Sequence, residues 1–167
     1  MSQLKPRNIF NGRLGIWQTL YAMKELVHEA SADSGFCRIS RELVHSEITP
    51  LGKTEALDLY VRQNMKFEND PTTFEFLKSP LVTLKEIIGR GYATGDCDDH
   101  VVLLAAMLKC NGIANAGIGL ALPSMGEGLN HVVNGIPLGD GGYKLLDTSV
   151  KSVRFGYVFD ESLAVNF

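Results

Sequence analysis

The chain has 167 residues, of which 45% are hydrophobic and 21% charged, with a formal net charge of −3. This composition is typical of a globular domain and excludes a largely disordered chain. The slightly acidic balance argues against a nucleic-acid partner. No apolar run approaches the roughly 18 residues that a membrane span needs, and the N-terminus lacks the apolar core of a secretory signal. We expect a loosely ordered arm at 1–13, one domain over 14–167, and a cytoplasmic location.

Helical periodicity marks three segments of the N-terminal half. Apolar residues recur at the spacing of one helix face from residue 14 to about 34. A second helix is predicted over 54–68, before the sequence Asn69-Asp70-Pro71, and a shorter one over 80–89. Residues 36–53 show no clear period, so their structure is left open.

The next helix has a different character, because residues 101–108 are apolar on nearly every side. Such a helix is normally buried all round. Asp96, Asp98 and Asp99 suit its N-terminal turn by capping and by their charge, and Asn111-Gly112 suits its end. Cys97 therefore lies at the N-terminus of a central buried helix.

After Gly112 the pattern changes to strand-like runs separated by Gly, Pro and Asn. The predicted strands cover 116–122, 130–136, 143–148 and 153–159. Helices followed by antiparallel strands indicate an α+β fold, in which the N-terminal helices and the central helix pack on one face of a C-terminal antiparallel sheet.

The three cysteines are Cys37, Cys97 and Cys110. Their odd number and wide spacing resemble neither a disulfide framework nor a zinc site, so free thiols are expected, with Cys37 and Cys110 in structural roles. Cys97 differs because a helix N-terminus favours a thiolate. The neighbouring aspartates would repel that anion, so a catalytic Cys97 needs an imidazolium partner.

Among the four histidines, His28 and His45 suit surface positions, and no group is evident to orient His100. His131 instead opens a strand. If the following turn is centred near Gly139, the pairing sum of 278 places His131 directly opposite Asp147, where the carboxylate can orient the imidazole. A slip by one residue would separate them. Asp147 has a competing interpretation, in which it only closes an Asx turn with Thr148 and Ser149.

These residues predict a Cys-His-Asp triad. Cys97 attacks an amide or ester carbonyl, His131 transfers the proton, and Asp147 orients His131. The Cys97 backbone N–H is one expected oxyanion donor, and Tyr92 is a candidate for the second. Tyr92, Gly95 and Asn130 are predicted to contact substrate.

The motifs resemble the transglutaminase-like superfamily of papain-related cysteine enzymes. The resemblance is carried by Gly95-Asp-Cys-Asp-Asp99 with the apolar run after it, by Asn130-His-Val-Val133 and by Leu146-Asp-Thr148. Upstream, 56–62, 67–71 and 79–84 resemble the lead-in of transglutaminase-like proteins encoded by tailed bacteriophages and prophages. The similarity covers about residues 54–150.

The resemblance implies a peptidase, amidase or transamidase that forms a thioester with a protein or peptide substrate. The alternative is a catalytically silent phage structural or host-interaction protein, located in the bacterial host cell or the virion. The sequence Val132-Val-Asn-Gly135 departs from many relatives and leaves the acceptor side of the site open. No cofactor is expected, although calcium-dependent relatives make Ca²⁺ near Asp96 and Asp98 an alternative. The loop at 122–129 is predicted to gate the site.

Overall fold

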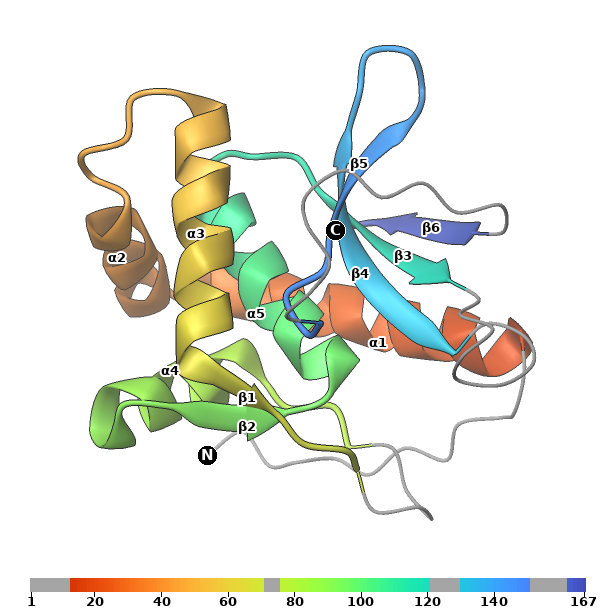
Figure 1. Cartoon of the computed structure of the whole chain (residues 1–167), viewed down its shortest axis with the longest axis horizontal. Coiled ribbons are helices and arrows are strands. Elements are labelled where there is room, and N and C mark those ends of the chain that lie inside the picture. The colour runs from red at the N-terminus through yellow and green to blue at the C-terminus, as the bar shows by residue number, and fades with distance from the viewer. Residues whose placement is uncertain (1–12, 71–75, 121–129, 151–161) are drawn as a thin grey trace.

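The computed structural model describes residues 13–70, 76–120, 130–150 and 162–167 (Figure 1). Five helices and six strands are present in these residues. In chain order they are α1 (Arg13–Ala32), α2 (Ser34–Leu43), α3 (Pro50–Asn64), β1 (Met65–Phe67), α4 (Pro80–Arg90), β2 (Ala93–Gly95), α5 (Cys97–Cys110), β3 (Ala116–Leu120), β4 (His131–Pro137), β5 (Tyr143–Leu146) and β6 (Ser162–Asn166).

Helix α5 forms the centre of the fold, as its uniformly apolar sequence predicts. Every residue from Val101 to Leu108 is buried. Helices α1 to α4 pack around it, and β4 covers its remaining side. The expected C-terminal end is confirmed, because Asn111 caps the helix and Gly112 adopts a positive φ of 71° that favours glycine.

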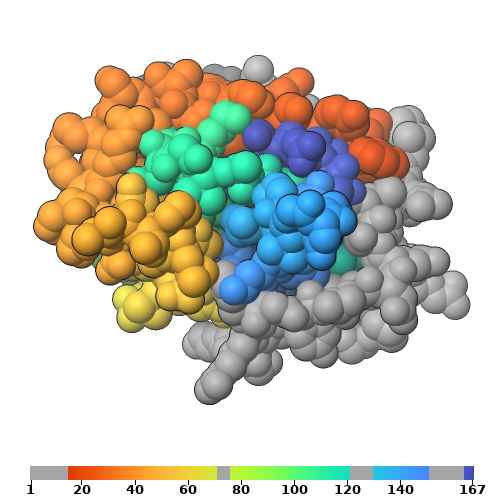
Figure 2. All heavy atoms as spheres, turned by 90° about the horizontal axis from the view of Figure 1, so that it is seen from above, coloured from red at the N-terminus to blue at the C-terminus, as the bar shows by residue number. Residues whose placement is uncertain are grey.

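The four-stranded sheet has the order β5-β4-β3-β6, and all of its neighbouring strands are antiparallel. This arrangement confirms the predicted α+β class, with helices on one side of an antiparallel sheet. Seen from above, the C-terminal residues lie between α1 and the β4–β5 hairpin (Figure 2). A separate parallel pair, β1 with β2, leads directly into α5.

Several predicted boundaries differ from the structure. Helix α2 occupies part of the segment left open, and its start is capped by Asp33, which accepts a hydrogen bond from the Phe36 backbone N–H. Helix α3 starts four residues before Thr54 because Thr49 caps it and Pro50 suits its first turn. It ends at Asn64, where β1 replaces the predicted last turn.

In the C-terminal half, strand β6 was not predicted. The predicted strand at 153–159 and the predicted gating loop at 122–129 lie outside the described residues, and so does nearly all of the predicted arm at 1–13. The proposal of one domain stays a prediction.

The β4–β5 hairpin does not have the predicted register. Asn134 pairs with Leu146 and Pro137 with Tyr143, which gives a pairing sum of 280 instead of 278. A shift of two residues keeps the same side chains on the same face of the sheet. His131 and Asp147 are therefore diagonal neighbours instead of directly opposed ones.

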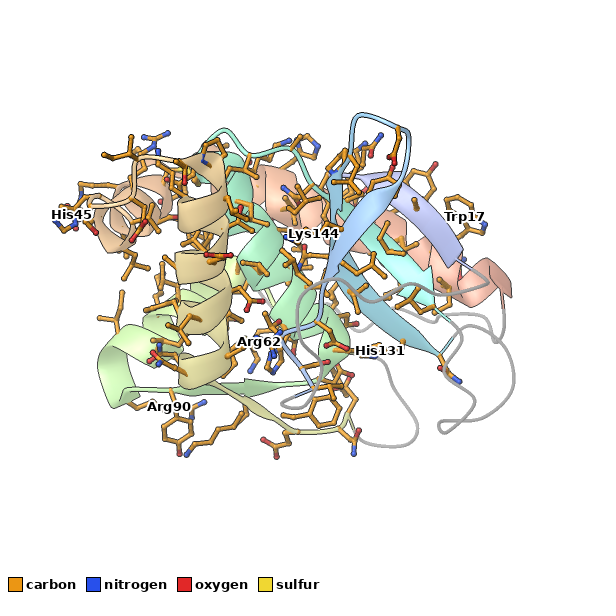
Figure 3. All side chains as sticks on the ribbon, turned by 45° about the horizontal axis from the view of Figure 1, so that its top comes forward. Trp17, His45, Arg62, Arg90, His131 and Lys144 are labelled. Atoms are coloured by element: carbon orange, nitrogen blue, oxygen red, sulfur yellow. A yellow bond between two sulfur atoms is a disulfide. The ribbon has the colours of Figure 1, made fainter. Side chains whose placement is uncertain are left out.

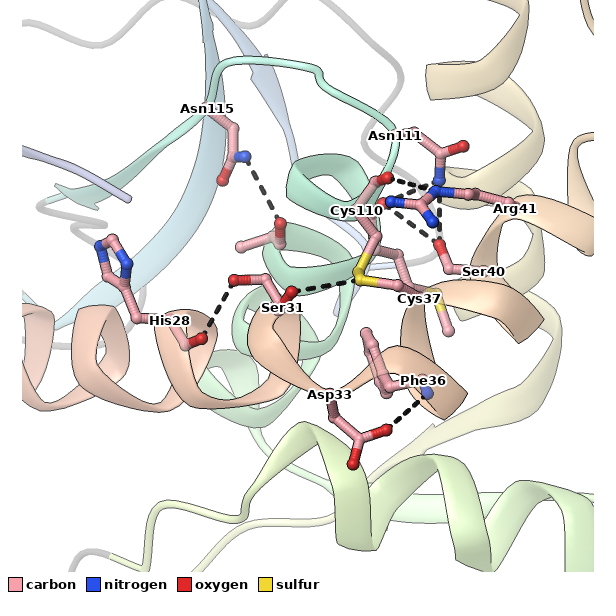
Figure 4. Close-up of a disulfide and its surroundings, with 12 residues drawn as sticks. His28, Ser31, Asp33, Phe36, Cys37, Ser40, Arg41, Cys110, Asn111 and Asn115 are labelled. Atoms are coloured by element: carbon pink, nitrogen blue, oxygen red, sulfur yellow. Dashed lines mark hydrogen bonds between the residues drawn. A yellow bond between two sulfur atoms is a disulfide. The ribbon is translucent and has the colours of Figure 1, made fainter.

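The prediction of three free thiols is wrong, because Cys37 and Cys110 form a disulfide (Figure 4). The bond joins α2 to the last residue of α5 across 73 positions of sequence. Arg41 supports the same junction by donating from Nε to the Cys110 carbonyl oxygen at 2.9 Å. The spacing gave no sign of this pairing, since only the packing of α2 on α5 brings the two cysteines together.

Among the described residues, no helix is both long and apolar enough to cross a membrane.

Reduction of the disulfide is expected to destabilise the fold. Closing a loop of this length stabilises a protein by about 2–4 kcal/mol, chiefly through the unfolded chain. The double substitution Cys37→Ala/Cys110→Ala should lower the free energy of unfolding by that amount in urea titrations, whereas Cys97→Ala should leave it nearly unchanged. Equal stability of the double variant and the oxidised wild type would contradict the pairing.

Candidate active site

Cys97 is the first residue of α5, and the short strand β2 delivers the chain to it. Its side chain is partly exposed, whereas the helix behind it is buried. The first backbone N–H groups of a helix have no partner within the helix and carry partial positive charge. The cysteine that is not disulfide-bonded thus lies where a thiolate is electrostatically favoured.

His131 and Asp147 meet at the start of β4 and just after the end of β5. Nε2 of His131 lies 2.7 Å from Oδ2 of Asp147, and only 2% of the histidine side chain is exposed. The other ring nitrogen, Nδ1, has no hydrogen-bond partner. The carboxylate therefore orients the ring through Nε2 and leaves the buried Nδ1 without a hydrogen-bond partner.

Asp147 also closes a turn, so the predicted Asx turn is present together with the contact to His131. Its second oxygen, Oδ1, accepts hydrogen bonds from the Ser149 N–H at 3.0 Å and the Ser149 hydroxyl at 2.7 Å. Burial by itself would raise the pKa of Asp147, but the His131 ring and the Ser149 donors outweigh burial and lower the pKa. The side chain thus stays ionised, with one oxygen for the turn and one for the histidine.

Two side chains, Asn134 and Arg62, hold these elements in place. Asn134 of β4 donates from Nδ2 to the Val101 carbonyl oxygen at 3.2 Å, which fixes the strand one helical turn from Cys97. Arg62 of α3 donates to the Val150 carbonyl oxygen at 3.1 Å and pairs with Asp58 at 2.7 Å. The segment that follows Asp147 is therefore tied to α3.

The three aspartates around Cys97 lie in different environments. Asp96 occupies the N-cap position, but its side chain makes no capping hydrogen bond, so the capping role predicted for it is wrong. Asp99 accepts a hydrogen bond from the Lys78 backbone N–H at 2.6 Å, and burial raises its pKa to about 7. It anchors the segment before α4 to the first turn of α5.

Asp98 is 1% exposed, and neither carboxylate oxygen has a hydrogen-bond partner. Its pKa is raised well above the ordinary value by burial first, then by the side chain of Asp96, with which it forms a hydrogen bond only when one of the two acids is protonated, and then by the charges of Asp96, Asp99 and Cys97. One oxygen from each of the three aspartates lies within 4.8 Å of the others. An unpartnered buried carboxylate in such a cluster has the donor chemistry of a hard-cation site.

Gly95 and Tyr92 precede this cluster in the chain. Gly95 is the last residue of β2, and Tyr92 comes directly before that strand. A Cβ atom at Gly95 would lie 2.6 Å from the Cβ of Asp99, so only glycine leaves room for that buried acid. The ring of Tyr92 has the Lys66 ammonium 3.5 Å from its centroid and the Arg90 guanidinium at 4.9 Å. Arg90 lies well away from His131 in Figure 3. Tyr92 thus belongs to a cation–π cluster, and its oxyanion role stays a prediction.

Asn130 is tied to the sheet by its backbone N–H, which donates to the Leu120 carbonyl oxygen at 2.9 Å. Its contact with substrate stays a prediction.

The residue that sequence reasoning undervalued is His100, which is buried in the first turn of α5 with its ring centroid 6.4 Å from that of Phe67. Burial lowers its pKa to about 4, against the opposing charge of Asp147. Its position three residues after Cys97 was the available signal.

A model of the transglutaminase-like superfamily matches residues 38–148. The chain belongs to that superfamily. The match extends from α2 to the residue after Asp147, and so contains every residue discussed above as a catalytic candidate. No curated protein sequence matches the chain. The resemblance to phage-encoded members is not tested by these comparisons and stays a prediction.

Solved structures share the fold at low sequence identity. A proposed protease from Parabacteroides distasonis has a TM-score of 0.55 and 15% identity over 77% of this chain. A proposed cysteine protease from Cytophaga hutchinsonii has a TM-score of 0.52 and 16% identity over 69% of it. The chain spans only 26% and 37% of those two proteins. Calcium-bound LapG of Legionella pneumophila has a TM-score of 0.55 and 19% identity, and the alignment covers 87% of this chain and 83% of LapG.

The hydrogen bond between His131 and Asp147 predicts a defined pH dependence of stability. Because the native pKa of Asp147 lies below the ordinary 3.8, its carboxylate stabilises the fold above that pH, and the contribution is lost as pH falls through the native value. Asp147→Asn should cost about 2 kcal/mol at pH 6, and the difference from wild type should shrink below pH about 4. Urea unfolding at several pH values measures this difference.

The matched control is Asp140→Asn, which changes an exposed carboxylate in the turn of the same hairpin. This variant should show neither the loss at pH 6 nor the convergence in acid. Parallel stability curves for wild type and Asp147→Asn down to pH 2.5 would contradict the lowered pKa.

Proposed function

We propose that the protein is a cysteine-dependent hydrolase or acyltransferase that acts on peptide-type amides. The observation that carries the proposal is the buried pair of His131 and Asp147, in which the ring nitrogen Nδ1 is left without a partner. A histidine oriented by a carboxylate, in a fold that presents a cysteine at the start of a buried helix, is the arrangement that thiol acyl transfer requires.

The geometry supports a definite division of roles. With the Nε2 proton donated to Asp147, Nδ1 of His131 accepts the thiol proton of Cys97 and forms an imidazolium beside the thiolate. The sulfur attacks the carbonyl carbon, and the Cys97 backbone N–H stabilises the oxyanion. The imidazolium then protonates the leaving amine. Water or a second amine then attacks the thioester carbon while His131 takes up its proton, and the C–S bond breaks to release the acid or the new amide and to regenerate the Cys97 thiolate beside the imidazolium.

The acidic residues beside Cys97 oppose this chemistry unless their charge is reduced. Protonation of Asp98, which its raised pKa favours, is one way to reduce the repulsion. A bound cation is another, and we propose that Asp96, Asp98 and Asp99 bind Ca²⁺. Support comes from the unpartnered oxygens of Asp98 and from the clustering of the three carboxylates. The similar LapG structure is calcium-bound. When bound, the ion would supply positive charge next to the thiolate.

The nucleophile is tested by its reaction with iodoacetamide. Wild-type Cys97 should be alkylated at pH 6.5 at least tenfold faster than a free cysteine, because an ion pair with His131 holds it as thiolate. His131→Ala should reduce the rate to that of an ordinary thiol, whereas His28→Ala, which changes a mostly exposed histidine of α1, should leave it unchanged. Mass spectrometry of the labelled peptide measures each rate.

Activity supplies the second half of this test. Cys97→Ala should abolish both peptide hydrolysis and the incorporation of a fluorescent amine into casein. Which of the two reactions wild type performs distinguishes a hydrolase from a transamidase. Alkylation of wild type no faster than of His131→Ala, together with an absence of turnover, would refute the proposed function.

Calcium binding is tested by thermal unfolding with and without the ion. A cation that binds only the native state raises the unfolding temperature, and the stabilisation grows with the logarithm of the ratio of free cation to its dissociation constant. The test adds 2 mM CaCl₂ to EDTA-treated protein. If the dissociation constant is about 20 µM, this concentration is about 100 times that constant, and the fold is stabilised by about 2.7 kcal/mol. Asp98→Asn should remove the calcium-dependent shift, and Glu55→Gln, at an exposed carboxylate of α3, should retain it. An equal shift in Asp98→Asn and wild type would place the ion elsewhere.

A further inference from the structure

The turn after β5 carries Asp147 beyond the sheet. Strand β5 pairs with β4 as far as Leu146, so Asp147 is the first residue past the paired region. Its Oδ1 accepts hydrogen bonds from the backbone N–H groups of Ser149 at 3.0 Å and of Val150 at 3.3 Å. These bonds set the direction of the carboxylate within the turn. They do not fix the turn relative to the helices, because all of their members belong to the turn itself.

A residue of α3 connects this turn to the helices. Arg62 donates from Nη1 to the Val150 carbonyl oxygen at 3.1 Å, and from Nε to Oδ2 of Asp58 at 2.7 Å. The side chains of Arg62 and Asp58 are only 21% and 15% exposed. A guanidinium is planar and its donors have fixed directions, so the contact with Asp58 also determines where the other donor points. Arg62 therefore holds the Val150 carbonyl group at a defined place beside α3.

Val150 links Arg62 to the catalytic candidates by a continuous chain of hydrogen bonds. Its carbonyl oxygen accepts from Arg62, and its N–H donates to Oδ1 of Asp147. The other oxygen of Asp147, Oδ2, lies 2.7 Å from Nε2 of His131. The chain thus runs from α3 through the turn to the proposed base. A displacement of the turn would move the carboxylate that orients the His131 ring.

The charges near Arg62 make its guanidinium difficult to replace. Burial raises the pKa of Asp58, the hydrogen bond and charge of Arg62 lower it, and the charge of Asp147 raises it. The buried His100 ring responds to the charges of both Asp147 and Arg62, but burial lowers its pKa to about 4, so it is neutral near pH 6.5. Arg62 is thus the cation that offsets two nearby carboxylates.

We propose that Arg62 is a positioning residue for the reaction of Cys97, because it fixes the turn that directs Asp147 at His131. The inference rests on the proposed function. Arg62 acts on the reacting atoms through Val150, Asp147 and His131, and it needs no contact with substrate. A merely structural Arg62 would affect the free energy of unfolding and leave the orientation of His131 in the folded protein unaltered.

The first measurement follows the tautomer of His131 by ¹⁵N NMR of the full-length, EDTA-treated protein, with signals assigned by their loss in His131→Ala. The wild-type ring should carry its proton on Nε2, as the contact with Asp147 requires. Arg62→Met should populate both tautomers. The matched control is Arg38→Met, which breaks an exposed pair of the same i,i+4 spacing with Glu42, and it should keep the wild-type signal.

The second measurement is the rate at which iodoacetamide alkylates Cys97 at pH 6.5. Arg62→Met should reduce this rate about fivefold, since a base that is misplaced part of the time assists less often. Arg62→Lys keeps a charge beside Asp58 but lacks two donors in fixed directions, so it should lose the rate as Arg62→Met does. Asp58→Asn keeps an acceptor for Nε and should retain the rate. Thermal unfolding of each variant measures whether it is folded.

The outcomes separate the two proposals. If wild type reacts fast with iodoacetamide, an unaltered tautomer and rate in folded Arg62→Met or Arg62→Lys would overturn the positioning role and leave the proposed function standing. Equal losses in Arg38→Met would overturn it as well. Slow alkylation of wild-type Cys97 would refute the proposed function, and the positioning role with it.

Discussion

The burial of α5 on every side is the constraint on which the rest of the structure depends. Its middle residues are all apolar and all buried, so the other helices and β4 must enclose it. A helix enclosed in this way meets polar surroundings only at its two ends. The C-terminal end is tied to α2 by the disulfide and by Arg41, and the N-terminal end carries Cys97 and the three aspartates. The groups of the candidate site are therefore concentrated at the N-terminal end of α5.

The candidate site also requires that the His131 ring be held in a fixed orientation, and the β4–β5 hairpin with Asp147 provides this. Asp147 can hold His131 because its other oxygen is fixed by Ser149, which sets the direction of the carboxylate. Asn134 then attaches the strand to α5. Each link is a hydrogen bond between groups that are wholly or partly buried, so the loss of any one leaves a polar group unsatisfied. The geometry of the candidate site is thus inseparable from the stability of the core.

The electrostatics of the site contain an opposing pair of effects. The start of α5 favours an anion at Cys97, and the adjacent acids disfavour it. Asp99 is used structurally, since it binds the Lys78 backbone and fills the space that Gly95 leaves. Asp98 has no such partner and is buried all the same. Folding alone does not explain why a carboxylate is buried here without a hydrogen-bond donor, and a bound proton or cation would neutralise its charge.

The sequence by itself determined the class of the fold, the central helix and the residues that form the candidate site. Those features follow from local patterns, which are the apolar run at 101–108, the helix end at Asn111-Gly112, and the positions of His131 and Asp147 on either side of a predicted hairpin turn. The predicted hairpin register was wrong by two residues, yet His131 and Asp147 still meet, because side chains two residues apart along a strand share a face.

Only the tertiary structure decided the disulfide, the strand β1 and the roles of the individual acids. Cys37 and Cys110 are distant in sequence and meet because α2 packs on α5. Asp96, Asp98 and Asp99 are identical in type and nearly adjacent, yet one makes no cap, one has no partner and one anchors another segment. Burial and hydrogen-bond partners depend on which distant residues surround a side chain, and a local pattern carries no record of those neighbours.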